Sequence, residues 1–110
     1  MSRHVDQVYL QHIIDSISKV EGYLNGIKYE DFLVNNLLID ALIRNLEIIG
    51  EASNNISEEF KESHPDLNFR PDISMRNQLA HGYDDVDLEI VWNTVTEDLP
   101  VLKNQLLEYL

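Results

Sequence analysis

The chain has 110 residues, of which 44% are apolar and 25% are charged, a composition ordinary for one soluble globular domain. Its 20 acidic residues outnumber 8 Lys and Arg, and the net charge of -12 argues against broad non-specific binding to nucleic acid or to anionic membranes. The absence of Cys excludes disulfides and thiolate metal sites. No stretch approaches the ~20 apolar residues that cross a bilayer, and no signal-peptide core begins the chain, so we expect a cytoplasmic protein with residues 1–110 as a single domain.

Apolar residues recur at helical spacing through the first part of the chain and predict a core-facing helix from about Ser2 to Leu24. Val8 and Leu10 are expected to widen its apolar stripe. A second, longer helix is predicted from Tyr29 to about Ile56, and its dense apolar positions indicate burial on more than one side.

The remaining segments are also predicted to be helical. A short helix is expected from Ser57 to Glu62, and a third element from Asp72 to about His81. The last helix is predicted from Leu88 to Leu110, capped by Asp87, and Pro100 should kink or divide it near Asp98 and Leu99. The fold class that these elements predict is all-α, an antiparallel four-helix bundle with extra short helices.

The stretch RNQLAHGY places a cation, an imidazole and a phenol within eight residues. On an ideal helix Arg76 and Tyr83 lie within about 20° of each other, whereas His81 lies about 140° from Arg76. Gly82 can end the helix and let the His81 ring turn toward Arg76. The spacing therefore permits a shared pocket without requiring one. The spacing alone favours the interpretation that Arg76 and His81 contact carbonyls and the dipole at the end of a helix.

The chemistry that these groups support is specific. His81 can accept and donate a proton near neutral pH, and Arg76 can hold a phosphate through two hydrogen bonds. Together, without a metal or a thiol, they suit attack of a ribose 2′-hydroxyl on the neighbouring phosphodiester. Asn77 can orient the phosphate or the ribose, and Tyr83 can donate a hydrogen bond, stack on a base or be modified. The four His form no ligand-spaced motif, so no metal and no cofactor are expected.

A polar stripe runs along the second predicted helix, where Asp40, Arg44, Glu47 and Glu51 follow at offsets of three and four. These residues either line a functional cleft or form ordinary ion pairs, and the second interpretation is favoured. Glu51 is the member that we single out as an accessory group able to orient Arg76.

Three other features also have two interpretations. Gly50 allows close helix packing rather than function, and Trp92 is expected to anchor the core or an interface. The acidic loop at Asp84, Asp85 and Asp87 is either a docking surface for a partner or, more simply, a solvated cap.

The segment MRNQLAHGYDDVD resembles the signature of the HEPN superfamily, which consists of an Arg, an adjacent polar residue and a His four to six residues later. The added Tyr after His81 resembles the HepT-like branch. The segments LIRNLEIIGEASNNISEEF and VWNTVTEDLPVLKNQL resemble other helices of that branch, so the likeness covers about Asp40 to Leu106. One departure lies in HPDLNFRPDISM, where Phe69 stands near a position at which members usually carry Trp.

The resemblance implies a helical homodimer and a metal-independent ribonuclease that acts as the toxin of a toxin–antitoxin pair. Arg76 and His81 are then the catalytic pair, and Asn77 is the accessory polar group. The implied partner is a minimal nucleotidyltransferase antitoxin that silences the toxin by transferring AMP to Tyr83. The alternative is a non-catalytic helical dimer that binds a nucleotide or a nucleotidyltransferase, and the charge of -12 supports it because an RNA enzyme gains from a positive entry path.

Overall fold

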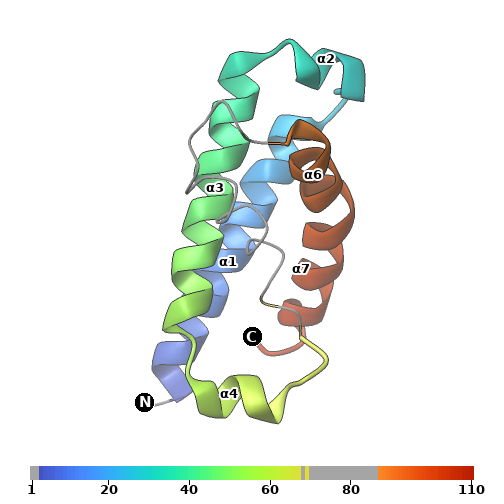
Figure 1. The fold of residues 1–110 in the computed structure, drawn as a ribbon. Coiled ribbons are helices and arrows are strands. Elements are labelled where there is room, and N and C mark those ends of the chain that lie inside the picture. The colour runs from blue at the N-terminus through green and yellow to red at the C-terminus, as the bar shows by residue number, and fades with distance from the viewer. Residues whose placement is uncertain (1–2, 68, 70–86) are drawn as a thin grey trace.

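The computed structural model describes residues 3–67, 69 and 87–110, and within them three long helical rods lie side by side (Figure 1). The first rod is α1 (Arg3–Leu24), and the second is α3 (Asn36–Asn55). The third consists of α6 (Leu88–Asn93), a π-helical turn (Thr94–Asp98) and α7 (Leu99–Leu107). The short helices α2 (Tyr29–Leu33) and α4 (Glu58–Ser63) lie at opposite ends of the rods. The predicted all-α fold is confirmed.

The rod α1 lies beside both α3 and α7, and it runs antiparallel to each of them (Figure 1). Its predicted end is confirmed at Leu24, and Gly26 has a φ of 76°, which glycine adopts without the steric cost that a Cβ would add. Leu10 is fully buried on the inner face, whereas the Val8 side chain is 43% exposed. The prediction that Val8 widens the apolar stripe was therefore wrong, because this position turns toward solvent.

The single long helix predicted from Tyr29 to Ile56 is wrong, because the chain leaves helical geometry at Val34 and Asn35. At Asn35 the backbone has φ of -112° and ψ of 89°, and its side-chain oxygen accepts a hydrogen bond from the backbone N–H of Leu38 at 3.0 Å. Asn is a strong N-cap residue, since its side chain satisfies a backbone donor that the first helical turn leaves unpaired. The apolar pattern continues across the break, but local capping by Asn35 begins a new helix there.

The cap predicted at Asp87 is confirmed, and the structure shows a second cap at Ser57. Ser57 caps α4 by accepting from the backbone N–H of Phe60 at 3.1 Å. Asp87 caps α6 by accepting from the N–H groups of Glu89 and Ile90 at 3.0 and 3.3 Å. The predicted short helix from Ser57 to Glu62 is thus confirmed to within one residue at each end, α4 being Glu58–Ser63.

Division of the last helix near Asp98 is also confirmed. The π-helical turn ends at Asp98, and Pro100 occupies the first turn of α7, where its missing N–H costs least. Two hydroxyls inside this rod accommodate the irregular turn: Thr94 donates to the Ile90 carbonyl at 2.8 Å and Thr96 donates to the Trp92 carbonyl at 2.7 Å. The rod continues through Pro100 instead of ending there.

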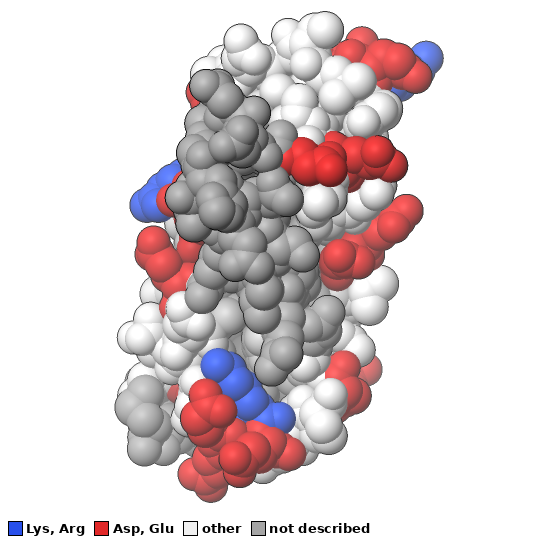
Figure 2. Space-filling view, viewed as in Figure 1, with Lys and Arg blue, Asp and Glu red and all other residues white. Residues whose placement is uncertain are grey.

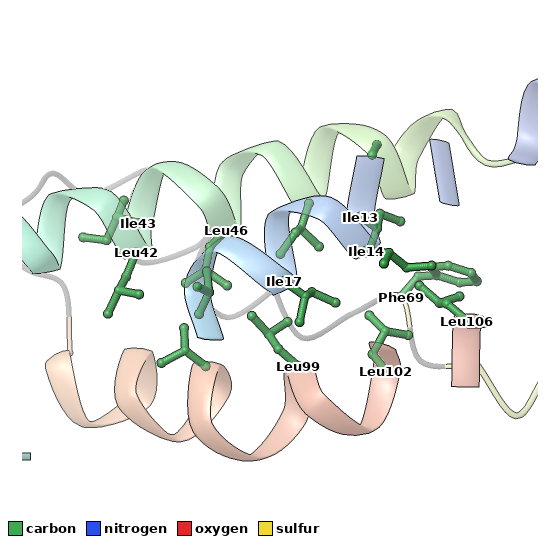
Figure 3. Packing of buried hydrophobic residues seen from close by; sticks show 14 of the residues in the cluster. Ile13, Ile14, Ile17, Leu42, Ile43, Leu46, Phe69, Leu99, Leu102 and Leu106 are labelled. Carbon is green, nitrogen blue, oxygen red and sulfur yellow. The ribbon is translucent and has the colours of Figure 1, made fainter. Parts of the chain in front are cut away.

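The hydrophobic core lies where α1 meets the other two rods, and Figure 3 shows their side chains pointing toward one another. Ile17 of α1 is fully buried between Leu46 of α3 and Leu99 of α7, and Ile13 is fully buried further along α1 near Phe69. Each fully buried side chain of this size contributes about 1.5–3 kcal/mol relative to an exposed one. The core thus holds α3 along its length and leaves its opposite face exposed to solvent.

The third predicted element, Asp72 to His81, lies outside the described residues and stays a prediction, as does the fourth member of the bundle. Within the described ranges, none of the helices combines the length and the apolar character that a membrane crossing requires.

A buried carboxylate joins the beginning of α1 to the beginning of α4. The side chain of Asp6 is 4% exposed and accepts two hydrogen bonds from Ser57, one from its backbone N–H at 2.9 Å and one from its hydroxyl at 2.7 Å. Because the same hydroxyl accepts from the N–H of Phe60, the Asp6 carboxylate orients the cap of α4. This contact connects residues 51 positions apart in the sequence.

Replacing Asp6 with Ala should lower the free energy of unfolding by about 2 kcal/mol, because a buried donor and a cap lose their acceptor. Chemical denaturation followed by circular dichroism measures the change. The matched control is Asp15→Ala on the same helix, where the exposed carboxylate accepts only from Gln11 at 2.8 Å, and a change below about 0.5 kcal/mol is expected. Equal effects of the two substitutions would contradict the role assigned to Asp6.

Candidate functional site

The polar stripe predicted on the second helix lies on the outer face of α3. Its four members, at positions 40, 44, 47 and 51, are all exposed. The guanidinium Nη1 of Arg44 lies 3.7 Å from Oε2 of Glu47, and these side chains are 63% and 43% exposed. An exposed pair of this kind contributes at most about 1 kcal/mol. For Arg44 and Glu47, the ordinary ion pair is therefore the interpretation that the structure confirms.

Glu51 stands one turn further along the same face. Its side chain is exposed, and its backbone carbonyl accepts from Nδ2 of Asn55 at 2.9 Å. The Glu51 carboxylate is thus held on a rigid helix and remains accessible to solvent. This placement is compatible with an accessory role and does not test it.

The inner side of α3 carries polar groups that the sequence analysis did not single out. Asn45 and Ser53 are 6% and 3% exposed. Nδ2 of Asn45 donates to the Ala41 carbonyl at 2.9 Å, but Oδ1 of Asn45 and Oγ of Ser53 have no hydrogen-bond partner among the described residues. The available signal was their position, because both share the helix face of Leu42 and Ile49, which are fully buried.

The residues predicted to carry the chemistry lie outside the described residues. This holds for Arg76, Asn77, His81 and Tyr83, and the proposed convergence of Arg76 and His81 on one phosphate therefore stays a prediction. Of the acidic loop, Asp87 alone lies within the described part, and its carboxylate caps α6. The capping interpretation is thus confirmed for Asp87.

Two histidines within the described part, His12 and His64, contact aromatic rings. His12 is exposed and meets the Tyr9 ring edge-on at 5.8 Å between centroids. His64 places Nδ1 2.8 Å from the Phe60 carbonyl, stacks on the Phe60 ring at 4.2 Å and meets Tyr109 edge-on at 4.5 Å. No group of three or more metal-ligating side chains exists within residues 3–67, 69 and 87–110. His64, Phe60 and Tyr109 form an aromatic cluster at the end of the molecule near α4.

Tyr109, in the same cluster, has a perturbed titration. Desolvation by burial raises the pKa of its phenol above 10.0, and the nearby carboxylates of Asp66 and Glu108 raise this pKa further. The ring of Tyr109 meets those of Phe60 and His64 edge-on at centroid distances of 5.9 and 4.5 Å.

Two other residues that the sequence analysis singled out lie in or against the core. Trp92 of α6 is half-buried and packs against Phe32 and Tyr29 of α2 at centroid distances of 5.1 and 5.5 Å, which confirms the predicted core anchor. Gly50 is buried within α3, and its role in close helix packing stays a prediction.

Acidic side chains are spread over the face shown in Figure 2, with few basic groups between them. This distribution agrees with the net charge of -12. A broad cationic track for nucleic acid is not present on the described part of this face. Any binding of a phosphodiester must depend on a local group of cations.

Comparison with known proteins identifies the family. The family model described as ribonuclease HepT-like matches residues 13–109. A protein named "Probable ribonuclease HepT" from Thermococcus cleftensis is 44% identical over 97 residues, which cover 88% of each chain. A protein named as a "Putative RNase" from Caldanaerobacter subterraneus is 37% identical over 93% of this chain and 91% of its own. Another protein so named, from Methanocaldococcus jannaschii, is 35% identical over 96% of both chains. No solved structure matches.

The described helices and the family match together define a protein of the HEPN-related, HepT-like class. The chain belongs to the HepT-like ribonuclease family, because the family model spans nearly all of it and the relatives exceed 30% identity along most of their length.

Replacing Glu51 with Gln should leave the free energy of unfolding within about 0.5 kcal/mol of the wild type, because the side chain is exposed on a regular helix. Denaturant titration measures this difference, and Glu47→Gln on the same face is the matched control. A loss of more than about 2 kcal/mol for Glu51→Gln alone would show that Glu51 supports the fold, so that a change in activity would not report on the site.

Proposed function

We propose that the chain is a metal-independent ribonuclease in which Arg76 and His81 act on RNA phosphodiesters. The observation that carries this proposal is family membership over residues 13–109, a range that includes the whole RNQLAHGY motif. Relatives of 44% and 37% identity are named as ribonucleases. The functional unit that we propose is a homodimer, in line with the family resemblance.

The reaction follows from the two side chains. The neutral imidazole of His81 accepts the proton of the ribose 2′-hydroxyl, and the 2′-oxygen attacks the adjacent phosphorus. The bond from phosphorus to the 5′-oxygen breaks, the leaving oxygen takes up a proton, and the products are a 2′,3′-cyclic phosphate and a 5′-hydroxyl. Arg76 stabilises the negative charge that gathers on the phosphoryl oxygens. No metal ion is required for any of these transfers.

Asn77 and Glu51 have supporting roles in this proposal. Asn77 stands next to Arg76 and offers an amide that can orient the phosphate or the ribose. Glu51 presents an exposed carboxylate from α3, and we assign to it the orientation of the Arg76 guanidinium.

The purified chain should cleave single-stranded RNA equally well with and without EDTA, and Arg76→Ala or His81→Ala should each lower the rate by about 10²–10³-fold. Cleavage of a labelled RNA resolved on a denaturing gel measures the rate. The matched controls are Lys19→Ala and His12→Ala, which remove an exposed cation and an exposed imidazole from α1. These controls should keep the wild-type rate.

We further propose that the chain is the toxin of a toxin–antitoxin pair and that a minimal nucleotidyltransferase silences it. The phenol oxygen of Tyr83 attacks the α-phosphorus of ATP in the partner's active site, pyrophosphate leaves, and AMP stays on the tyrosine. The added phosphodiester carries a negative charge two residues from His81, where it competes with the RNA phosphate and repels the substrate.

Tyr83→Phe should keep ribonuclease activity and lose modification by the proposed nucleotidyltransferase partner, because the acceptor hydroxyl is absent. Incubation of both proteins with ATP and Mg²⁺, followed by mass spectrometry, measures the added AMP. The control is Tyr23→Phe, which removes a phenol that is 43% exposed on α1 and should leave AMP transfer intact. Modification of Tyr83→Phe to the wild-type extent would exclude Tyr83 as the acceptor.

The alternative function is a non-catalytic helical dimer that binds a nucleotide or a nucleotidyltransferase. The net charge of -12 favours it, since RNA is repelled by most of the surface. The RNA cleavage assay described above, together with a binding measurement, separates the two functions. Purified wild-type protein that leaves RNA intact but binds the nucleotidyltransferase supports the alternative.

A further inference from the structure

An apolar tip projects where α2 ends and α3 begins. It consists of Leu33, Val34 and Leu37, whose side chains are 39%, 84% and 81% exposed. These residues follow one another closely in sequence, so their exposed surfaces form one patch and are not scattered singly. Isolated exposed apolar residues need no explanation, whereas a grouped set is typical of an interaction site.

The tip is held in one conformation by the break between the two helices. The N–H groups of Val34 and Asn35 donate to the carbonyls of Asp31 and Phe32 at 3.4 and 3.1 Å, and the Asn35 side chain caps α3. Phe32, which precedes the tip, is fully buried and packs against Tyr29 and Trp92. Because these bonds already order the backbone, a partner that binds here loses little free energy to ordering.

Acidic groups surround the tip. Glu30 and Asp31 lie on α2, and Glu89 lies on α6, which packs against α2 through Trp92 and Tyr29. All three acids are exposed. Figure 2 shows uncharged atoms over the end of the molecule where α2 lies, with acidic groups and some basic atoms beside them. The three acids outnumber Lys28, the exposed residue that caps α2, so the patch has an apolar centre and a rim that is net acidic, an arrangement found in protein interfaces.

The geometry points to a docking site for a basic amphipathic helix of another protein, with an apolar face flanked by Lys and Arg. The apolar centre selects that face, and the acidic rim selects the cations beside it. The exposed apolar area comes from three side chains, less than the roughly 800 Å² per partner of a standard interface, so the contact belongs to the weak, transient class. This inference is independent of the proposed ribonuclease activity.

Charge excludes the two other occupants that an apolar patch suggests. A second copy that met the tip symmetrically would place Glu30, Asp31 and Glu89 against the same three acids, and like charges in apposition disfavour association. An anionic membrane surface is disfavoured for the same reason. A basic partner protein with an apolar face complements both the apolar centre of the tip and the acidic residues around it.

The test uses a synthetic amphipathic helix with Leu on one face and Lys on the other, lacking Trp. Trp92 is the only Trp of the chain and lies against α2, so its fluorescence reports binding near the tip. The full-length protein should bind this peptide with an affinity that falls as salt is added. A peptide with Glu in place of Lys should bind at least about tenfold more weakly.

Matched double substitutions locate the site. Val34→Ser with Leu37→Ser should weaken binding by about tenfold or more, and Glu30→Gln with Glu89→Gln should weaken it and reduce its salt dependence. The apolar control is Val101→Ser with Leu107→Ser, at positions of α7 that are 59% and 48% exposed. The charge control is Glu59→Gln with Glu62→Gln on α4. Both controls should bind like the wild type.

Three outcomes would overturn the proposal. The first is absence of binding by the Lys peptide, and the second is equal weakening by the tip substitutions and their controls. The third comes from sedimentation equilibrium: if the tip substitutions convert a dimer to a monomer, a second copy occupies the tip. None of these measurements uses RNA, so failure of the docking site and failure of the ribonuclease proposal are distinguishable.

Discussion

Burial of one face of α1 against α3 and α7 is the interaction on which the described structure depends. Leu10, Ile13, Ile17 and Val20 are fully buried on that face, and α1 is the rod that contacts both of the others along its length. Because the apolar contacts of α3 are directed toward α1, its outer face is left to polar residues. The exposed position of Glu51 is a consequence of this arrangement.

The two ends of the molecule differ in character: one carries the exposed apolar tip, and the other carries the buried hydrogen bonds between Asp6 and Ser57. At one end Asn35 begins α3 and leaves Val34 and Leu37 in solvent. At the other end the Asp6 carboxylate holds the cap of α4 in place. Acidic side chains are spread over the face between these two ends (Figure 2).

The errors of the sequence analysis have a common physical cause. The apolar pattern between Tyr29 and Ile56 continues through Asn35, and periodicity therefore predicts one helix where side-chain capping makes two. Leu33 and Leu37, two of the dense apolar positions in this range, are exposed in the described chain. Of the candidate site, the sequence identified the motif and the stripe on α3. The position of the motif relative to that stripe depends on contacts that no local pattern specifies.

Local signals in the sequence determined the helical class, the caps at Ser57 and Asp87, the irregularity before Pro100 and the family motif, because each depends on residues within one or two turns. Tertiary structure alone decided which apolar residues are buried and joined Asp6 to Ser57 across 51 positions. It also brought Trp92 against α2. These features depend on how three rods pack against one another, and packing is set by the shapes of whole faces instead of by the order of neighbouring residues.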